Sequence, residues 1–242
     1  MRKLNDFWWI KFMTRRFIEP IATPNKINQR IYNVPLMSLA TKIYGKCPRC
    51  HQATIIKAHY QYFNAPKEIK LRCLSCPFYE DWNAEKIYGK AIGKARKPCP
   101  NCGSKWLSAE IISDDGKSLA DKAEVSCKVC DKTSYLTLAW RQLVRLNEPF
   151  DPFFSRPLWL QTSCVSKILW VYNETHLSYL KSYIEADLRE GNDRLSGSMI
   201  SRLPKWLTAA KNRKNVLKAM TKLEEKLEDL NCQWIYQRKF RI

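Results

Sequence analysis

The sequence lacks any apolar run long enough to cross a membrane. No run of about 18 apolar residues occurs, so we expect no membrane-spanning helix. Met1-Arg2-Lys3 resembles the basic start of an export signal, but Asp6 and Lys11 interrupt the apolar segment that would have to follow it. We therefore expect a cytoplasmic protein whose thiols stay reduced.

The sequence also lacks the residue patterns of common catalytic centres. Its 3 histidines are scattered, and no phosphate-binding glycine loop with the required lysine and hydroxyl is present. The acidic residues form no arrangement typical of a two-metal nuclease. We therefore expect no enzymatic activity, and a divergent nuclease is the weaker alternative.

Acidic residues are scarce relative to basic ones. Lys and Arg number 42 against 23 Asp and Glu, which gives a net charge of +19 and a pI near 9.6. Residues 1–98 carry +13 and residues 204–242 carry +6, whereas residues 99–203 are neutral. Such an excess favours a polyanionic partner, and we predict nucleic acid, DNA in particular. The alternative is a structural subunit whose basic faces dock on partner proteins.

Cysteine, in contrast, is abundant and regularly spaced. Eight of the 10 cysteines form four Cys-x-x-Cys pairs, which are Cys47/Cys50, Cys73/Cys76, Cys99/Cys102 and Cys127/Cys130. The first two pairs are separated by 22 residues and the last two by 24. This spacing predicts two consecutive structural Zn²⁺ sites, each with four thiolates and no open coordination position. We expect sequential grouping of the pairs rather than interleaved grouping.

The fold class that follows is α+β, with two consecutive small β zinc ribbons before a mainly helical C-terminal domain with a short hairpin. We expect an aromatic and basic docking segment over 1–45, ribbon 1 over 46–90, ribbon 2 over 91–148 and the C-terminal domain over 149–242. Each ribbon is too short to be stable without its metal.

A five-residue repeat suggests that the ribbons are duplicated. Lys42–Lys46 and Lys86–Lys90 have the same sequence, but the second copy lies eight residues further from the cysteine pair that follows it. We interpret residues 91–98 as an insertion into the second copy. Asp114-Asp115-Gly116 in ribbon 2 is typical of a hairpin tip.

The C-terminal domain shows both strand and helix patterns. Residues 158–162 and 168–172 read as a β-hairpin, Asn173 caps a helix that Gly191 ends, and Pro204 can open another. A last helix from about Asn212 carries its apolar residues at spacings of four and three. We expect His176 to be a surface residue.

The basic residues that we predict to contact nucleic acid form two groups. Lysine and arginine neutralise phosphates regardless of base sequence. The candidates near the ribbons are Arg49, Lys70, Arg72, Lys90, Lys94, Arg96 and Lys97, and those near the last helix are Lys205, Lys211, Arg213 and Lys214.

An aromatic cluster near the N-terminus is a candidate for partner docking. Read as a helix, the segment would place several aromatic side chains beside arginines. The alternatives are that it packs on this protein's own core or lies at a membrane interface. The cluster consists of Phe7, Trp8, Trp9, Phe12 and Phe17.

The order of the four knuckles resembles zinc-ribbon proteins, and in particular the two-zinc segment of the replication-restart helicases known as primosomal protein N-prime. The resemblance covers about 85 residues and implies docking on DNA or on a DNA-processing complex. We expect a non-enzymatic adaptor for a larger complex in bacterial replication, mobile-element or defence biology. The helicase's nucleotide-binding motifs are missing here, so its ATPase activity does not carry over. The C-terminal half, including residues 158–162 and 201–206, resembles bacterial proteins of similar length without assigned activity.

Overall fold

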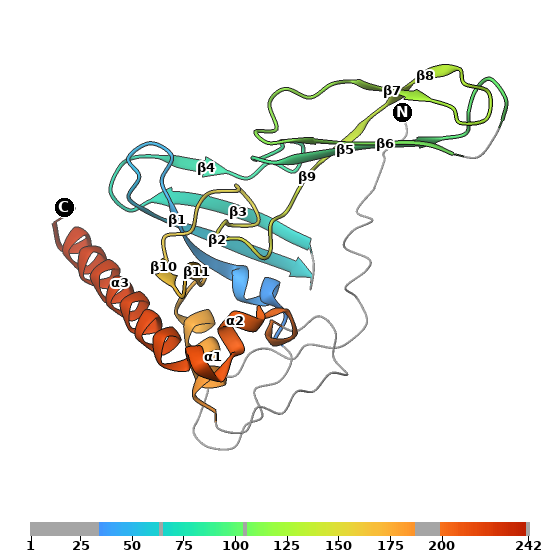
Figure 1. The fold of residues 1–242 in the computed structure, drawn as a ribbon. Helices are drawn as coiled ribbons and strands as arrows, with labels where there is room; N and C mark the ends of the chain where they lie inside the picture. The colour runs from blue at the N-terminus through green and yellow to red at the C-terminus, as the bar shows by residue number, and fades with distance from the viewer. Residues whose placement is uncertain (1–33, 63–64, 104–105, 187–198, 241–242) are drawn as a thin grey trace. The chain divides into compact units, whose positions relative to one another are not determined.

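The computed structural model describes residues 34–62, 65–103, 106–186 and 199–240 (Figure 1). The described residues divide into two compact units. The helical unit lies within Met1–Lys42, Ala58–Glu68 and Leu160–Ile242, and the ribbon unit within Ile43–Lys57 and Ile69–Trp159. Among the helices of the described residues, none combines the length and the apolar character needed to span a membrane.

Ribbon 1 is built on a four-stranded antiparallel sheet with the order β1-β2-β3-β4. The strands are β1 (Lys42–Lys46), β2 (Ala53–Tyr62), β3 (Ala65–Cys73) and β4 (Tyr79–Asp81). On β3 the apolar Ile69 and Leu71 are buried, while Arg72 between Leu71 and Cys73 is exposed. This alternation is the two-residue period of a strand that has one face on a core.

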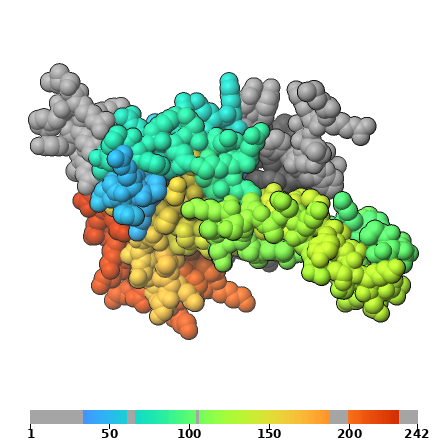
Figure 2. Space-filling view, turned by 90° about the horizontal axis from the view of Figure 1, so that it is seen from above, coloured from blue at the N-terminus to red at the C-terminus, as the bar shows by residue number. Residues whose placement is uncertain are grey.

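Ribbon 2 is a small sandwich of two sheets. The first has the order β6-β5-β9, from β5 (Ala91–Lys97), β6 (Leu107–Ser113) and β9 (Ala139–Gln142). The second is the hairpin of β7 (Lys122–Ser126) and β8 (Thr133–Thr137). Both sheets lie together in Figures 1 and 2, coloured green to yellow-green. The core of ribbon 2 contains Ala95, Cys99, Leu107, Ala123, Cys127, Leu136 and Leu138, so metal ligands and apolar side chains share it.

The interpretation of residues 91–98 as an insertion is wrong. Residues 91–97 form β5, the central strand of ribbon 2, which runs into the third cysteine pair as β1 runs into the first. The second copy of the pentapeptide, residues 86–90, is a loop with Gly89 at φ 70°, whereas the first copy is β1. Identical letters adopt different structures because only the first copy has a strand partner.

The turn at Asp114-Asp115-Gly116 forms, but it closes no hairpin. Its neighbours β6 and β7 belong to different sheets, so the turn links the two layers of ribbon 2. Asp115 Oδ1 accepts from the Lys117 backbone N–H at 3.0 Å, and Gly116 takes φ 64°. The turn residues therefore predicted the local bend correctly. They could not predict the sheet, because β5 pairs with β6 on one side and on the other with β9, which begins 26 residues after the end of β6.

The helical unit combines a tight hairpin with helices. Strands β10 (Gln161–Cys164) and β11 (Lys167–Trp170) pair in register, and their linking residues Val165 and Ser166 both have positive φ. The helices are α1 (Glu174–Glu185), α2 (Lys205–Thr208) and α3 (Arg213–Phe240), with 3₁₀ turns at Leu36–Thr41, Ile200–Arg202 and Ala210–Asn212. Helix α3 contacts both α1 and β10 (Figure 1). The predicted α+β class, with antiparallel sheets bearing two four-cysteine clusters before a helical region with a hairpin, is confirmed.

Sequence signals placed the helix starts well. Asn173 caps α1 by accepting from the His176 backbone N–H at 2.9 Å, and Pro204 precedes α2. The apolar stripe of α3 is buried, through Val216, Met220, Leu223, Leu227 and Leu230. Helix α1 ends at Glu185, before Gly191, which lies outside the described residues.

The prediction that His176 lies on the surface is wrong. The ring is only 3% exposed, packs edge-on against Trp170 and Tyr172, and accepts at Nδ1 from the Tyr172 backbone N–H at 3.1 Å. Burial lowers the pKa of His176 to about 3. The neutral imidazole therefore ties the end of β11 to the first turn of α1, because its acceptor nitrogen must stay unprotonated.

Gly93 is required where β5 passes beneath an indole ring. A Cβ added at Gly93 would lie 2.7 to 2.9 Å from ring atoms of Trp140, which is on the neighbouring strand β9 directly opposite. The indole is fixed in place because its Nε1 donates to the Ala120 carbonyl at 2.8 Å. The glycine thus allows the ring to cover the inner face of the sheet.

We predict that Gly93→Ala destabilises ribbon 2 by about 1–3 kcal/mol, because the indole must leave its site. Chemical unfolding of the zinc-loaded protein measures this cost. Trp140→Ala should remove most of the effect of the glycine substitution, so the double variant is less destabilised than the sum of the single ones. Strict additivity would contradict the proposed contact.

We predict a pH-dependent contribution from His176. Its folded pKa of about 3 lies below the ordinary value of 6.5, so its stabilisation is complete above pH 6.5 and is lost as the pH falls toward 3. His176→Gln retains an acceptor but does not titrate. The stability advantage of the wild type over this variant should therefore shrink between about pH 7.5 and 5.5, as measured by denaturant unfolding. A constant difference would refute the buried neutral imidazole, since acid effects elsewhere are common to both proteins.

Candidate metal centres and the basic faces around them

Each cysteine pair lies in a tight turn that directs both of its sulfur atoms toward the same site. In the first turn the Arg49 backbone N–H donates to Cys47 Sγ at 3.4 Å, and in the second the Ser75 and Cys76 N–H groups donate to Cys73 Sγ at 3.3 Å. Val129 repeats the contact to Cys127 Sγ at 3.5 Å. These amide groups favour the thiolate form, which is the form that binds metal.

Three of the four turns end with a residue in the left-handed conformation. His51 has φ 60°, Gly103 66° and Asp131 54°, so His51 occupies the position where glycine is common in such turns. The second turn differs, because Pro77 follows Cys76 and its ring fixes φ near about −65°. The second turn still closes with the hydrogen bond found in the first and fourth turns, since the Cys73 N–H donates to the Phe78 carbonyl at 2.9 Å.

The eight sulfurs gather into two groups of four. Cys47, Cys50, Cys73 and Cys76 form one group, and Cys99, Cys102, Cys127 and Cys130 form the other. Within each group all sulfur atoms lie within 4.8 Å of one another. The grouping is therefore sequential, as predicted, and each site is contained in a single ribbon.

The sulfur separations fit a tetrahedral zinc ion. Zn–S bonds of about 2.3 Å in a tetrahedron place neighbouring sulfurs about 3.8 Å apart. The measured separations are 3.7 Å for Cys47–Cys76, 3.5 Å for Cys50–Cys73, 3.8 Å for Cys99–Cys130 and 3.7 Å for Cys102–Cys127. A disulfide would require about 2.05 Å. The two groups are consistent with two structural Zn²⁺ sites, which confirms the cofactor prediction.

The protonation of the first group shows why a cation belongs there. Burial opposes the charged form of Cys47, but backbone N–H groups outweigh it and lower the pKa of that thiol to about 7. Burial raises the pKa of Cys73 to about 12 despite similar amide donors. Four adjacent thiolates therefore need a bound dication to balance their charge. Four sulfur ligands complete the shell of zinc, so the metal's role is to hold the fold together.

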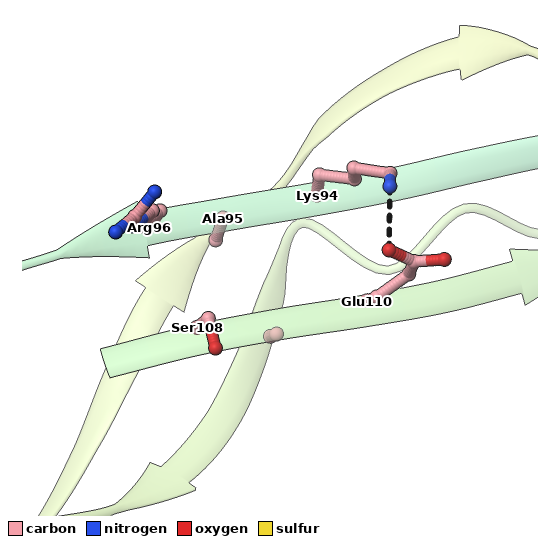
Figure 3. A pocket seen from close by; sticks show the side chains of 6 residues that line it. Lys94, Ala95, Arg96, Ser108 and Glu110 are labelled. Carbon is pink, nitrogen blue, oxygen red and sulfur yellow. Dashed lines mark ion pairs between the residues drawn. The ribbon is translucent and has the colours of Figure 1, made fainter. Parts of the chain in front are cut away.

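The predicted nucleic-acid residues near the ribbons are exposed or half-buried on the ribbon unit. Arg49 lies in the first knuckle, and Lys70 and Arg72 lie on β3 opposite Asp81 and Tyr79 of β4. On and beside β5, Lys90 pairs with Asp114 at 2.9 Å and Lys94 with Glu110 at 2.5 Å, as Figure 3 shows for the second pair. Arg96 lies over the ring of Trp106, and Lys97 is exposed at the end of the strand.

The other predicted residues lie in different surroundings. Lys205, Lys211 and Lys214 are exposed in the helical unit, whereas Arg213 donates through Nη2 to the Glu185 carbonyl and joins α3 to the end of α1. The structure therefore gives Arg213 a packing role. The aromatic docking cluster, Phe7, Trp8, Trp9, Phe12 and Phe17, lies outside the described residues.

Sequence reasoning missed the exposed residues that lie beside the predicted cations. Trp106 is 54% exposed, and its ring centroid is 5.0 Å from the Arg96 guanidinium carbon. Arg141 is exposed on β9, directly opposite Ile92 of β5. Trp106, Ser108 and Glu110 are every second residue along the chain. This spacing could have predicted that Trp106 lies on the same strand face as Ser108 and Glu110. Its nearness to Arg96 depends on the β5–β6 pairing, which the insertion hypothesis concealed.

Comparison with known proteins gives no relative for this chain, since no family model, curated protein sequence or solved structure matches it. The resemblance to the two-zinc segment of replication-restart helicases therefore supports no family assignment. The geometry by itself defines the class, an α+β protein with two four-cysteine clusters consistent with zinc-binding knuckle sites.

We predict two zinc ions per chain in reduced, purified protein, measured by elemental analysis. Cys127→Ser should lower the content to about one, because each cage is closed within its own ribbon, and should unfold ribbon 2 while ribbon 1 keeps its metal. Cys164→Ser is the matched control, since that buried thiol of β10 belongs to neither group. Fewer than two zinc ions in the wild type, or metal loss in the control, would refute the assignment.

Proposed function

We propose that this protein is a non-enzymatic zinc-ribbon adaptor that binds nucleic acid, DNA in particular, for a larger complex in bacterial replication, mobile-element or defence biology. The ribbons present the binding surface, and zinc holds them in shape. This proposal joins the two four-cysteine groups to the positive charge of the surrounding chain.

One observation carries the proposal. Each ribbon exposes an arginine next to an exposed aromatic ring on a rigid antiparallel strand pair. In ribbon 1, Arg72 of β3 is directly opposite Tyr79 of β4, which is 49% exposed. In ribbon 2, Arg96 lies over Trp106. Arginine with an aromatic ring offers both a phosphate contact and a stacking surface, the combination that nucleic-acid-binding proteins use.

The acidic residues beside these cations do not prevent anion binding. The Lys94–Glu110 pair has side chains 47% and 54% exposed, and the Lys90–Asp114 pair is similarly open to water. Exposed ion pairs contribute only about 0–1 kcal/mol. Phosphate contacts release condensed counterions, so the exchange of a carboxylate for a phosphate is favourable at moderate salt.

The helical unit contributes a second basic surface. Exposed lysines lie on α2, just before α3 and along the first turns of α3, with no acidic residue between Pro204 and Leu223. The N-terminus of a helix carries partial positive charge and normally favours acidic residues. Lysines at this position add positive charge, which a bound phosphate would neutralise. These lysines are Lys205, Lys211, Lys214, Lys218 and Lys222.

A protein-docking subunit is the second candidate function. Ile112 is 57% exposed and Val129 72% exposed, both in ribbon 2, and such apolar side chains suit a protein partner. In that case the basic faces and the aromatic N-terminal segment would dock on proteins. A stoichiometric partner that is lost when residues 1–18 are removed, together with absent nucleic-acid binding, would favour it.

We predict that binding of the zinc-loaded protein to DNA weakens steeply with salt. Four or more phosphate contacts correspond to a slope of log affinity against log salt of about −3 or steeper. Fluorescence-anisotropy titrations between about 50 and 300 mM salt give this slope. Removal of zinc with a chelator should weaken the binding, because the ribbons then lose their shape and only the lysines of the helical unit remain in place.

An affinity that hardly changes with ionic strength would refute phosphate-driven binding. Arg72→Ala should flatten the slope by about one unit if that side chain contacts a phosphate. The same samples, incubated with plasmid and Mg²⁺, test the nuclease alternative. Metal-dependent cleavage would establish an enzyme and overturn the adaptor proposal.

A further inference from the structure

The three-stranded sheet of ribbon 2 has two chemically different faces. The inner face packs on the core through Ala95 and Leu107, and Trp140 covers Gly93 on that side. Strand alternation and register put a second set of side chains on the opposite, outer face. On this outer face the exposed residues are Lys94 and Arg96 of β5, Ser108, Glu110 and Ile112 of β6, and Ala139 and Arg141 of β9, whereas Ile92 of β5 on the same face is only 6% exposed.

An exposed aromatic ring extends this outer face. Trp106 immediately precedes β6 and stays in its two-residue period with Ser108. The Arg96 guanidinium lies over the indole at 5.0 Å, so a planar cation and an aromatic ring are held against each other in water. The Trp106 side chain is half exposed and Arg96 beside it is exposed too. A flat ligand can therefore stack on this pair without disturbing the core.

Beside Arg96 and Trp106 lies a hollow that contains the exposed ion pair of Lys94 and Glu110. It is lined by Lys94, Ala95, Arg96, Ser108, Ala109 and Glu110 and has a volume of about 370 Å³, near the lower end of the ~300–1,000 Å³ range of ligand sites. Figure 3 shows Lys94 and Glu110 reaching toward each other across the two strands, with Arg96 and Ser108 further along them. Both partners are exposed, so Lys94 can exchange Glu110 for a phosphate at little cost.

The opposite outer face of the same ribbon provides an internal comparison. On β7–β8 the exposed side chains include Lys122, Glu124 and Tyr135, with Tyr135 67% exposed directly opposite Glu124. One cation therefore faces one carboxylate there. The β6–β5–β9 face instead has three cations, Lys94, Arg96 and Arg141, against Glu110. An aromatic ring is present on both faces, but only one of them combines it with excess positive charge.

We infer that the outer face of β6–β5–β9 is a binding site for single-stranded nucleic acid. An unpaired base stacks on Trp106 and the Arg96 guanidinium, and the flanking phosphates contact Lys94 and Arg141. Single strands are specified because the site offers a stacking platform, and the bases of a duplex already stack on one another. This inference rests on the proposed function and assigns it a site and a substrate class.

The test uses the full-length, zinc-loaded protein and a fluorescein-labelled oligothymidylate of about 15 nucleotides, with a duplex of matched length as the competitor. Trp106→Ala should weaken single-strand binding by roughly 5- to 100-fold, the effect of losing one stacked base. Trp106→Phe should restore most of the affinity. Duplex affinity should change much less in both variants.

Two charge variants on the same face should change the affinity in opposite directions. Arg96→Ala should weaken binding, whereas Glu110→Gln should tighten it severalfold, because the carboxylate no longer competes with phosphate for Lys94. The matched controls are Tyr135→Ala and Lys122→Ala, an exposed aromatic and an exposed cation on the other outer face of ribbon 2. Each control should change the affinity less than about twofold, and zinc content should remain two per chain throughout.

The outcomes separate the inference from the proposed function. If the wild type binds DNA with a steep salt dependence but Trp106→Ala and Glu110→Gln bind as it does, the site is refuted and the nucleic-acid function stands. Equal losses in Tyr135→Ala and Trp106→Ala would also refute this face. If the wild type binds neither single-stranded nor duplex DNA, both proposals fail.

Discussion

Metal–thiolate bonding is the constraint on which the ribbon unit depends. In ribbon 2 two of the seven buried core members are the ligands Cys99 and Cys127, and the other five are three leucines and two alanines. A core of that size cannot offset the chain entropy of about 50 ordered residues. Zinc ligation supplies about 10 kcal/mol or more in small domains, which is the missing stabilisation. The metal ligands are therefore also part of the packed core.

Because the metal stabilises the interior, the outer strand faces need not be apolar. The side chains of Arg72 and Tyr79 in ribbon 1, and of Arg96 and Trp106 in ribbon 2, are all exposed. Rigid strands hold these side chains at fixed spacing, which lowers the entropy lost when a ligand binds. The helical unit reaches stability differently, through the continuous apolar stripe of α3 and the buried hydrogen bonds of Asn173 and His176.

Local chemistry made part of this structure predictable. Cysteine spacing gave both metal groups, and Asn173 and Pro204 gave helix starts, because each signal acts within a few residues. The sequence could not give the pairing of β5 with β9, which joins residues more than 40 apart, and so the role of residues 91–97 was misread. The burial of His176 was missed for the same reason. Its surroundings depend on how the β10–β11 hairpin folds onto α1, which no short pattern encodes.

The strand order of ribbon 2 also determines when it can form during synthesis. Its central strand β5 is made first, but its partner β9 ends at Gln142, after all four ligands of the second site have been made. As translation proceeds from the N-terminus, Ala91–Lys97 remains without one of its two neighbours until that late segment leaves the ribosome. The second cage can gather its sulfurs once Cys130 has emerged, so metal can bind before the sheet is complete. In that order the last strand would dock on a ribbon whose metal site is already closed.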